Sequence, residues 1–194
     1  MTDPGALRDE PVDAQIVASD LVYEGRVWDV RSDTVRYGQT DIVRQYVDHP
    51  GAAAVVAVDD DERVLVIQQY RHPIRHRDWE IPAGLLDVAG EPPRETARRE
   101  LAEEADLVAE RWDDLVSVFT TPGGNDEVVH LFLARGLSPA PEVFAREDEE
   151  ADLRLEWVPL ADAVAAVLDG RFRNGILAVG VLAAAERLRA STGD

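Results

Sequence analysis

The sequence predicts an α+β fold, or a layered α/β/α fold, in a chain of 194 residues. Short β-rich segments recur along the chain, and a few longer segments have helical periodicity. The length suits one well-filled core but is too short for two comfortable domains. We find no internal repeat and no low-complexity tract that would indicate a repeat architecture.

The N-terminal region, residues 1–48, is expected to be an arm followed by a β-rich segment. Residues 1–13 are polar and contain Pro and Gly, which is typical of an extended or disordered arm. Three strands are predicted after the arm, at residues 16–23, 27–35 and 42–47. A turn at residues 37–40 precedes the last of them. Residues 49–194 are expected to form the main domain.

The main domain is predicted to contain further short strands and two C-terminal helices. An acidic turn, Asp59–Glu62, and a loop at Gly123-Gly124 separate neighbouring strands. The predicted strands and extended segments cover residues 52–58, 64–68, 79–82, 115–119, 128–133 and 153–158. The Ala/Leu-rich helices, predicted from periodicity, cover residues 161–168 and 175–188.

One further helix is predicted within the segment from Gly84 to Leu107, GLLDVAGEPPRETARRELAEEADL. Two consecutive prolines suit the first turn of a helix and place its start next to Glu91. Residues three and four apart are neighbours on a helix, so Glu100 faces Glu103 and Glu104 at a cost of roughly 0.2 to 0.5 kcal/mol for each like-charged pair. Such clustered carboxylates suit Mg²⁺ or Mn²⁺, and magnesium is commonly held by carboxylates together with substrate phosphates. The alternative is an ordinary solvated helix with surface ion pairs.

This segment resembles the Nudix box, whose pattern is Gly, five residues, Glu, seven residues, then Arg-Glu-aliphatic-x-Glu-Glu-x-Gly-aliphatic. The sequence departs from the pattern twice. Six residues separate Gly84 from Glu91, and Asp106 stands where the final Gly belongs. The extra residue falls in a turn, and Asp accepts left-handed backbone better than most residues other than Gly, so we expect the helix end to survive.

Within this family the chain resembles the ADP-ribose pyrophosphatase branch from about Val22 to Leu188. Five sequence features carry the resemblance: QQYRH at residues 68–72, WEIPAGLLD at 79–87, PGGNDE at 122–127, EDEEADL at 147–153 and RFRNG at 171–175. The resemblance implies a mixed β-sheet between α-helices, with residues 49–194 as the Nudix hydrolase domain. It also implies that the N-terminal β-rich region takes part in dimerisation.

The resemblance implies a site for Mg²⁺, with Mn²⁺ as the alternative. Glu100, Glu103 and Glu104 are the expected metal-binding side chains, and the backbone carbonyl of Ala83 is an implied further ligand. Arg99 is expected to orient the carboxylates by a salt bridge rather than to touch the substrate, and Glu91 to do the same from the helix start. Two or more ions could act as Lewis acids and could generate a bound hydroxide.

The general base is expected in the acidic segment that follows residue 146. Glu150 matches the base position of the branch best, and Glu149 is second. The alternative is that both side chains belong to a solvated acidic loop.

Substrate-binding residues are implied by the resemblance. Arg44 and Arg71 are expected to grip the pyrophosphate, because Arg matches phosphate oxygens bidentately. Trp28 is expected to stack on the adenine, from the same or from a partner subunit, and Glu127 to lie near the substrate or the metals. The alternatives are a half-buried strand aromatic for Trp28, a surface side chain for Arg44 and a loop carboxylate in water for Glu127.

Composition excludes several classes of protein. The formal net charge is -19, and all 20 basic residues are Arg, so binding to the nucleic-acid backbone is not expected. No cysteine is present, which excludes disulfides, thiolate catalysis and thiolate metal sites. The N-terminus lacks a signal pattern, and no apolar run reaches the length of about 18 residues that would span a membrane, so a cytoplasmic location is expected.

The resemblance therefore implies Mg²⁺-dependent hydrolysis of ADP-ribose to AMP and ribose 5-phosphate by a homodimer. A second hypothesis is the same chemistry on another nucleoside diphosphate sugar or on an oxidised nucleotide. A third is a non-catalytic sensor of ADP-ribose-like ligands. Sensors of this kind usually lose the carboxylates of the box, and here all of them are present.

Overall fold

The computed structural model describes residues 7–142 and 153–191, which belong to two compact units. The first unit contains the residues up to His49 together with Gly123–Asn125, and the second contains the rest of the chain. Among the described residues, no helix is long and apolar enough to cross a bilayer.

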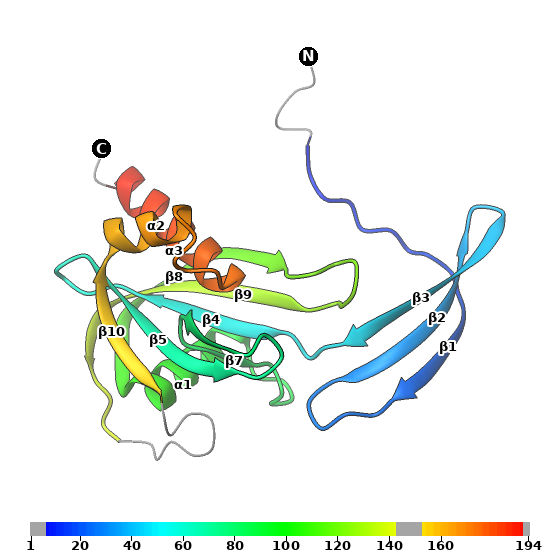
Figure 1. The fold of residues 1–194 in the computed structure, drawn as a ribbon, viewed down its shortest axis with the longest axis horizontal. Coiled ribbons are helices and arrows are strands. Elements are labelled where there is room, and N and C mark those ends of the chain that lie inside the picture. Colours follow the sequence, from blue (N-terminus) through cyan, green and yellow to red (C-terminus); the bar gives the residue numbers. More distant parts are fainter. Residues whose placement is uncertain (1–6, 143–152, 192–194) are drawn as a thin grey trace. The chain divides into compact units, whose positions relative to one another are not determined.

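The first unit is built on a three-stranded antiparallel sheet in the order β1-β2-β3 (Figure 1). Its strands are β1 (Ile16–Tyr23), β2 (Asp29–Tyr37) and β3 (Thr40–Asp48). Gly38, with φ of 63°, forms the tight turn between β2 and β3, where the positive φ favours glycine. The Val47 N–H donates to the Gly124 carbonyl at 3.0 Å, which attaches the 123–125 loop to this unit.

All eight residues of β1 are exposed, although most of them are apolar or aromatic. Strands that have one side against a core normally show alternating burial, which β1 does not. The large exposed side chains of this unit include Ile16, Val17, Leu21, Val22, Tyr23, Trp28 and Val43.

The second unit contains two β-sheets and three helices. The four-stranded sheet has the order β7-β4-β9-β8, and the three-stranded sheet has the order β10-β5-β6. The strands β4 and β9 pair in parallel, whereas the other neighbours are antiparallel, so the larger sheet is mixed. The elements are β4 (Ala52–Ala57), β5 (Arg63–Arg71), β6 (His76–Glu80), β7 (Ala83–Leu85), α1 (Pro93–Ala105), β8 (Leu107–Phe119), β9 (Val128–Pro139), β10 (Arg154–Pro159), α2 (Leu160–Leu168) and α3 (Gly175–Ser191).

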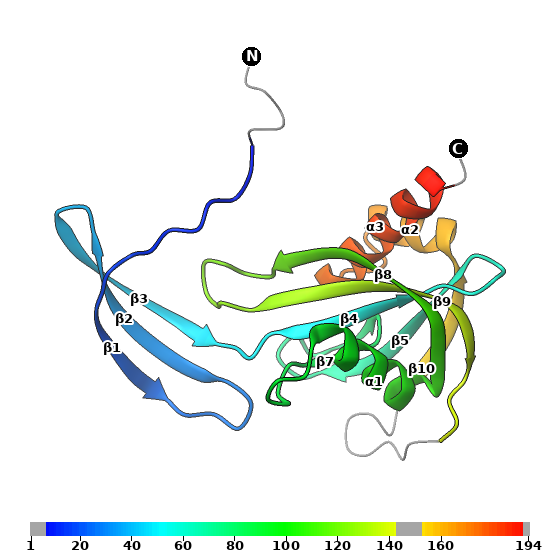
Figure 2. The same ribbon diagram turned by 180° about the vertical axis from the view of Figure 1, so that it is seen from behind.

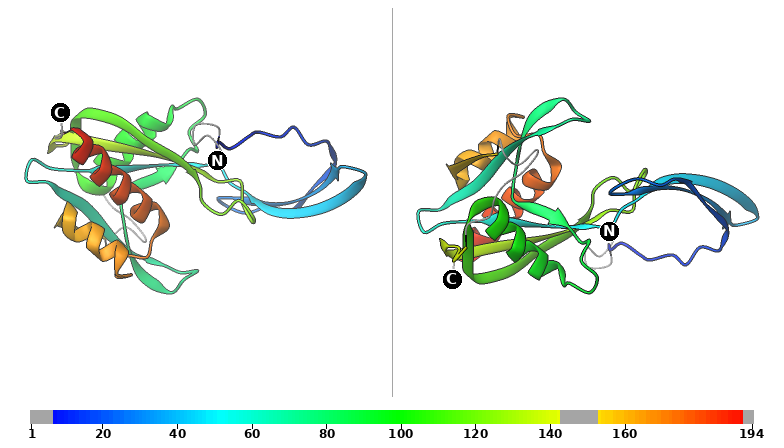
Figure 3. Two further views of the ribbon diagram at one scale, coloured as in Figure 1. Left: turned by 90° about the horizontal axis from the view of Figure 1, so that it is seen from above. Right: turned by 90° about the horizontal axis from the view of Figure 1, so that it is seen from below.

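The sheets of this unit lie between α1 on one side and α2 with α3 on the other (Figure 3). Strand β4 is buried throughout, and its side chains alternate between two hydrophobic clusters. Ala54 and Val56 pack with Leu177 and other residues of the α2–α3 side, whereas Val55 packs with Leu101 of α1. The predicted α+β fold with a mixed sheet between helices is therefore confirmed.

Helix α1 ends as the sequence predicts. Asp106 has φ of 54° and ψ of 35°, and its N–H donates to the Ala102 carbonyl at 3.0 Å. The longer turn before the helix closes locally, since the Glu91 N–H donates to the Val88 carbonyl at 3.0 Å and Gly90 has a positive φ. Both departures from the box pattern are thus accommodated locally, and α1 is continuous from Pro93 to Ala105.

Strand β8 is longer than predicted, because it begins at Leu107, directly after α1, and runs beside β9 (Figure 2). The sequence indicated only residues 115–119. This strand lies at the edge of the mixed sheet, where charged side chains such as Glu110, Asp113 and Asp114 are tolerated. Those charges hide the apolar alternation that marks a strand.

Candidate active site

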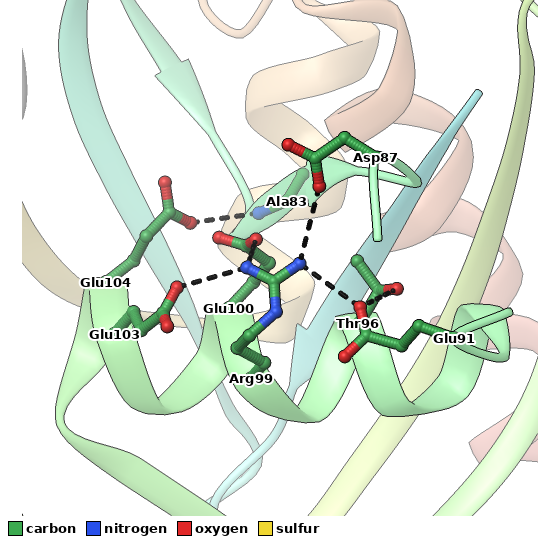
Figure 4. A network of polar contacts seen from close by, with 8 residues as sticks. All are labelled: Ala83, Asp87, Glu91, Thr96, Arg99, Glu100, Glu103 and Glu104. Atoms are coloured by element: carbon green, nitrogen blue, oxygen red, sulfur yellow. Dashed lines mark hydrogen bonds and ion pairs between the residues drawn. The ribbon is translucent and has the colours of Figure 1, made fainter. Parts of the chain in front are cut away.

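Helix α1 presents two chemically different flanks beside its buried stripe. The carboxylate flank consists of Thr96, Arg99, Glu100, Glu103 and Glu104 and faces β7 (Figure 4). The arginine flank consists of Arg94, Glu95 and Arg98, and Arg94 pairs with Asp114 of β8 at 2.7 Å. The helical spacing of three and four residues explains why each set shares one side of the helix.

Glu104 is a buried carboxylate that joins α1 to β7. Glu104 is only 4% exposed, and its Oε2 accepts a hydrogen bond from the Ala83 N–H at 2.9 Å. Burying an ionised carboxylate is unfavourable unless it is hydrogen-bonded or paired. The contact therefore fixes one carboxylate at the start of β7.

Gly84 provides the space that the Glu100 carboxylate occupies. A Cβ atom on residue 84 would lie 2.0 Å from Glu100 Oε1 and 2.1 Å from Glu100 Cδ. No side chain can be accommodated there unless Glu100 moves. Ala83 and Gly84 thus contact two carboxylates of α1 from the neighbouring strand.

Arg99 lies among four carboxylates. Its Nη1 donates to Glu100 at 2.6 Å and to Glu103 at 3.2 Å, and its Nη2 donates to Glu91 at 3.2 Å. Asp87 lies at 4.0 Å from Nη2. Burial alone would lower the pKa of the Arg99 guanidinium, but the hydrogen bond with Glu91 and the surrounding carboxylate charges together raise it.

Glu91 extends this network to the start of the helix. Thr96, which is fully buried, donates from its hydroxyl to Glu91 Oε2 at 2.8 Å. This hydrogen bond, followed by the one from Arg99, holds the pKa of the Glu91 carboxyl below its ordinary value despite desolvation. Glu91 therefore anchors the guanidinium from the side opposite to Glu103.

The oxygen donors of the carboxylate flank fit a hard divalent cation. Carboxylate and carbonyl oxygens suit Mg²⁺ or Mn²⁺, and the flank carries three Glu side chains beside the backbone of Ala83. Within residues 7–142 and 153–191, no three Asp, Glu or His side chains already converge into a metal-binding group. In this structure the positive charge between Glu100 and Glu103 comes from Arg99.

The segment from Trp79 to Gly84 links this flank to other parts of the second unit. The Trp79 ring lies 6.1 Å from the Phe172 ring, and the Pro82 carbonyl accepts from the Val55 N–H at 2.9 Å. Ile81 is buried in the core. Together with the contacts of Ala83 and Gly84, these interactions hold the segment firmly between the sheet, α1 and the loop before α3.

Arg71 and Glu127 lie in the second unit. Arg71, at the end of β5, forms a bidentate ion pair with Glu80, with its Nε and Nη2 each at 2.7 Å from a carboxylate oxygen. Glu127 is half-buried, and its Oε2 accepts from the Thr120 hydroxyl at 2.5 Å.

Trp28 and Arg44 lie in the first unit. The Trp28 ring stacks on His49 with centroids 5.3 Å apart and remains 47% exposed. Arg44 is exposed, and its Nη1 donates to the Val43 carbonyl at 2.8 Å. The predicted base residues, Glu149 and Glu150, lie outside the described residues.

Sequence reasoning missed two polar residues that the structure places around the Trp79–Gly84 segment. Glu80 is 6% exposed, and its carboxylate is shared by Arg71 and by the Gln69 amide at 3.4 Å. Asn174 donates to Asp78 at 3.1 Å and accepts from the Leu177 N–H at 3.0 Å. A charged residue inside the apolar stretch WEIPAG was the available signal for Glu80.

A groove of about 470 Å³ lies elsewhere on the second unit. It is lined by the start of α1 and by β8 and β9, including Arg94, Asp114, Ser117, His130 and Phe132. None of its lining residues belongs to the carboxylate flank. We therefore assign the candidate active site to the carboxylate flank, where the charged groups converge, and not to the groove.

Comparison with known proteins adds sequence and fold relatives. A family model described as NUDIX domain matches residues 48–177. An ADP-ribose pyrophosphatase of Mycobacterium tuberculosis is 45% identical over 172 residues, which cover 88% of this chain and 83% of the relative. A methanol dehydrogenase activator of Bacillus methanolicus is 37% identical over 177 residues, covering 89% and 94%. A crystal structure described as an ADP compounds hydrolase has a similar fold, with a TM-score of 0.78, 20% identity and coverage of 95% and 98%.

Proposed function

Because the chain belongs to the Nudix family and is a Nudix hydrolase, we propose that it hydrolyses the pyrophosphate bond of ADP-ribose to AMP and ribose 5-phosphate. We propose further that the reaction depends on Mg²⁺, with Mn²⁺ as the alternative. The observation that carries the proposal is the carboxylate flank of α1, held against Ala83 and Gly84 of β7. The 45% identity to an ADP-ribose pyrophosphatase supports the choice of substrate.

The residues of the flank have distinct proposed roles. Glu100, Glu103 and Glu104 would hold the metal, together with the Ala83 carbonyl. A divalent ion bound there supplies a Lewis acid for the phosphoryl oxygens and lowers the pKa of a bound water. Arg99 orients Glu100 and Glu103, to which it donates hydrogen bonds.

The proton of the attacking water requires a base. We assign this role to the carboxylate of Glu150, with Glu149 as the second candidate, on the basis of the family resemblance. A carboxylate suits the task because it can accept the proton of a water that lies within hydrogen-bond reach.

The substrate is proposed to be held by Arg71, Arg44, Trp28 and Glu127. The half-exposed Arg71 side chain and the exposed Arg44 can both offer planar guanidinium donors to phosphate oxygens. The exposed indole of Trp28 offers a surface on which an adenine can stack. Glu127 offers a carboxylate from the start of β9.

We propose that the protein is a homodimer in which the first unit contributes the contact. The supporting observation is that β1 is exposed along its whole length while carrying apolar side chains. A three-stranded sheet gains independent stability from a covered apolar face. A second copy of the chain would provide that cover, and light scattering on the purified protein measures the mass directly.

The experiment that tests the function compares substrates in the presence of Mg²⁺. Purified protein is incubated with ADP-ribose, ADP-glucose, NADH and 8-oxo-dGTP, and the products are separated by chromatography. We expect the highest kcat/KM for ADP-ribose, with AMP and ribose 5-phosphate as products. A higher kcat/KM for another substrate would contradict the ADP-ribose assignment.

A second candidate is hydrolysis of another nucleoside diphosphate sugar or an oxidised nucleotide. The observation that favours keeping it is a relative named for another nucleotide substrate, a CMP-5'-(N-acetyl-N-hydroxy-3-aminopropyl)phosphonate hydrolase of Streptomyces rubellomurinus, which is 30% identical over 84% of this chain and 78% of the relative. The same assay separates the two candidates, because it compares kcat/KM for their different substrates. The carboxylate flank could serve either reaction, so the preference would depend on the substrate-binding residues.

A further inference from the structure

We propose that Glu80 is a positioning residue that holds the guanidinium of Arg71 in the orientation that binds the substrate pyrophosphate. The inference rests on the proposed function, because it takes Arg71 as a phosphate-binding residue. It concerns a buried carboxylate to which the proposed chemistry assigns no part.

The ion pair between these residues has the geometry of a clamp. Glu80 Oε1 accepts from Arg71 Nε and Glu80 Oε2 accepts from Arg71 Nη2, both at 2.7 Å. Two parallel hydrogen bonds fix the plane of the guanidinium as well as its position, which a single contact does not. The Glu80 side chain is 8% exposed and that of Arg71 is 42% exposed, so the clamp is rooted in the core while the Arg side chain remains accessible.

Strand register shows that this pair is not an ordinary contact between facing residues. Arg71 lies opposite His76, whereas Glu80 lies opposite Ile67. Ile67 is four residues before Arg71 on β5. The Arg71 side chain must therefore lie back along β5, over Gln69, to reach the carboxylate. The backbone ladder between β5 and β6 already joins the strands, so the clamp sets the direction of the Arg71 side chain rather than the pairing.

The carboxylate is itself held from two directions. The Gln69 amide donates to Glu80 Oε2 at 3.4 Å, and Gln69 is 5% exposed. Glu80 is followed directly by Ile81, which is in the core, and Ala83, three residues after Glu80, donates its N–H to Glu104. The position of Arg71 is thereby tied to the same segment, Trp79–Gly84, that contacts the carboxylate flank.

Such a clamp favours substrate binding, because a flexible Arg side chain would otherwise have to be ordered when the ligand binds. Pre-orientation acts on the substrate and the transition state alike. It is therefore expected to affect KM and ligand affinity more than kcat.

The test is a double-mutant cycle with Glu80→Gln, Arg71→Met and the double variant. The dissociation constant for ADP-ribose is measured by calorimetry in EDTA, and KM and kcat are measured in Mg²⁺. We expect Glu80→Gln to weaken ADP-ribose binding roughly tenfold with kcat changed less than about twofold, the size expected for one charge-assisted hydrogen bond. The double variant should bind no more weakly than Arg71→Met alone, since Glu80 acts through Arg71.

Control variants separate positioning from general destabilisation. Glu156→Gln removes an exposed carboxylate from β10, beside β5, and should leave ADP-ribose binding unchanged. If Arg71→Met does not fold, Arg71→Lys completes the same cycle, because it keeps the charge but loses the planar fork.

Each outcome decides a different point. Additive losses in the cycle, or a Glu80→Gln variant that binds like the wild type, would overturn the positioning role while leaving the proposed function intact. An Arg71→Met variant that binds ADP-ribose normally in an otherwise active enzyme would overturn both the positioning role and the proposed role of Arg71 in binding, but not the proposed hydrolysis. A wild-type protein that neither binds nor hydrolyses ADP-ribose would instead overturn the proposed function, and the positioning role with it.

Discussion

The two flanks of α1 carry similar residue types in different surroundings. On the arginine flank, Arg98 pairs with Glu95 at 3.0 Å, and both side chains are about half exposed, 47% and 49%. On the carboxylate flank, the Arg99 side chain is 31% exposed, that of Glu100 is 12% exposed, and Glu104 is buried against the Ala83 N–H. The same helix thus has solvated ion pairs on one side and a constrained charge network on the other.

The neighbouring strand β7, and not charge content alone, distinguishes the carboxylate flank from the arginine flank. Exposed ion pairs contribute little to stability because water screens them and both side chains lose freedom. Carboxylates held by the Ala83 N–H and by a shared Arg, with space left for one of them by Gly84, are pre-organised instead.

Replacing Glu104 by Gln should have the largest effect on catalysis. Gln preserves the shape and an acceptor for the Ala83 N–H but removes a negative charge from the carboxylate flank, which we propose to hold the metal. We expect kcat for ADP-ribose hydrolysis in Mg²⁺ to fall by roughly 10²- to 10³-fold or more. Steady-state kinetics with circular dichroism on the same sample checks this, and full activity in a folded variant would contradict the assignment.

Replacing Gly84 by Ala should disturb Glu100 without changing any charge. The added Cβ would meet the Glu100 carboxylate at 2.0 Å, so that side chain must move. A displacement of about 1 Å in a catalytic group can cost on the order of 10²-fold in rate, and we expect a loss of that size in kcat/KM. The matched control is Gly175→Ala, since a Cβ at Gly175 meets nothing within 4 Å and its φ is not positive; equal activity losses in both variants would argue against the specific contact with Glu100.

The pH dependence of folding should reveal the Glu91 contact. Because the pKa of the Glu91 carboxyl is lowered in the folded state, its stabilising contribution is present above the ordinary Glu pKa of about 4.3 and is lost as pH falls through the lower folded value. The free energy of unfolding of the wild type should therefore exceed that of Glu91→Gln at pH 7, and the two values should converge as pH falls through the lowered folded pKa. Urea titrations at several pH values measure the difference, and a gap that widens on acidification would refute the sign.

Removing the exposed Arg98 should have the smallest effect. Its pair with Glu95 is solvated on both sides, so Arg98→Ala is expected to change kcat/KM less than about twofold and stability by about 0.2 to 1 kcal/mol. Its guanidinium also lies 5.6 Å from the Trp112 ring, which allows for the upper part of that range. A loss of activity comparable to that of Glu104→Gln would remove the distinction between the flanks.

Local chemistry made α1 predictable from the sequence. Pro92 and Pro93 set the start of the helix, and Asp106 takes the place of Gly at its end. These start and stop signals act within a few residues, so the sequence alone was enough to identify them. The fold class followed in the same way from the order of strands and helices, helped by the family resemblance. The extent of β8 did not, since charged residues at a sheet edge show no apolar alternation.

Contacts that depend on how distant elements meet could not be predicted. The hydrogen bond from the Ala83 N–H to Glu104 requires the docking of α1 on β7, and so does the close approach of the Glu100 carboxylate to Gly84. The Arg71–Glu80 pair requires the register of β5 and β6. Sequence spacing identified the carboxylates, but it contained no information on which backbone groups hold them.

The most direct test of the central claim is Mn²⁺ binding, followed by electron paramagnetic resonance, in wild type, Glu100→Gln and Glu95→Gln. Each variant neutralises one carboxylate of the same helix, on opposite flanks. We predict that Glu100→Gln weakens Mn²⁺ binding by at least about tenfold while Glu95→Gln binds like the wild type. Equal binding by all three proteins, or a loss confined to Glu95→Gln, would contradict the assignment of the metal to the carboxylate flank.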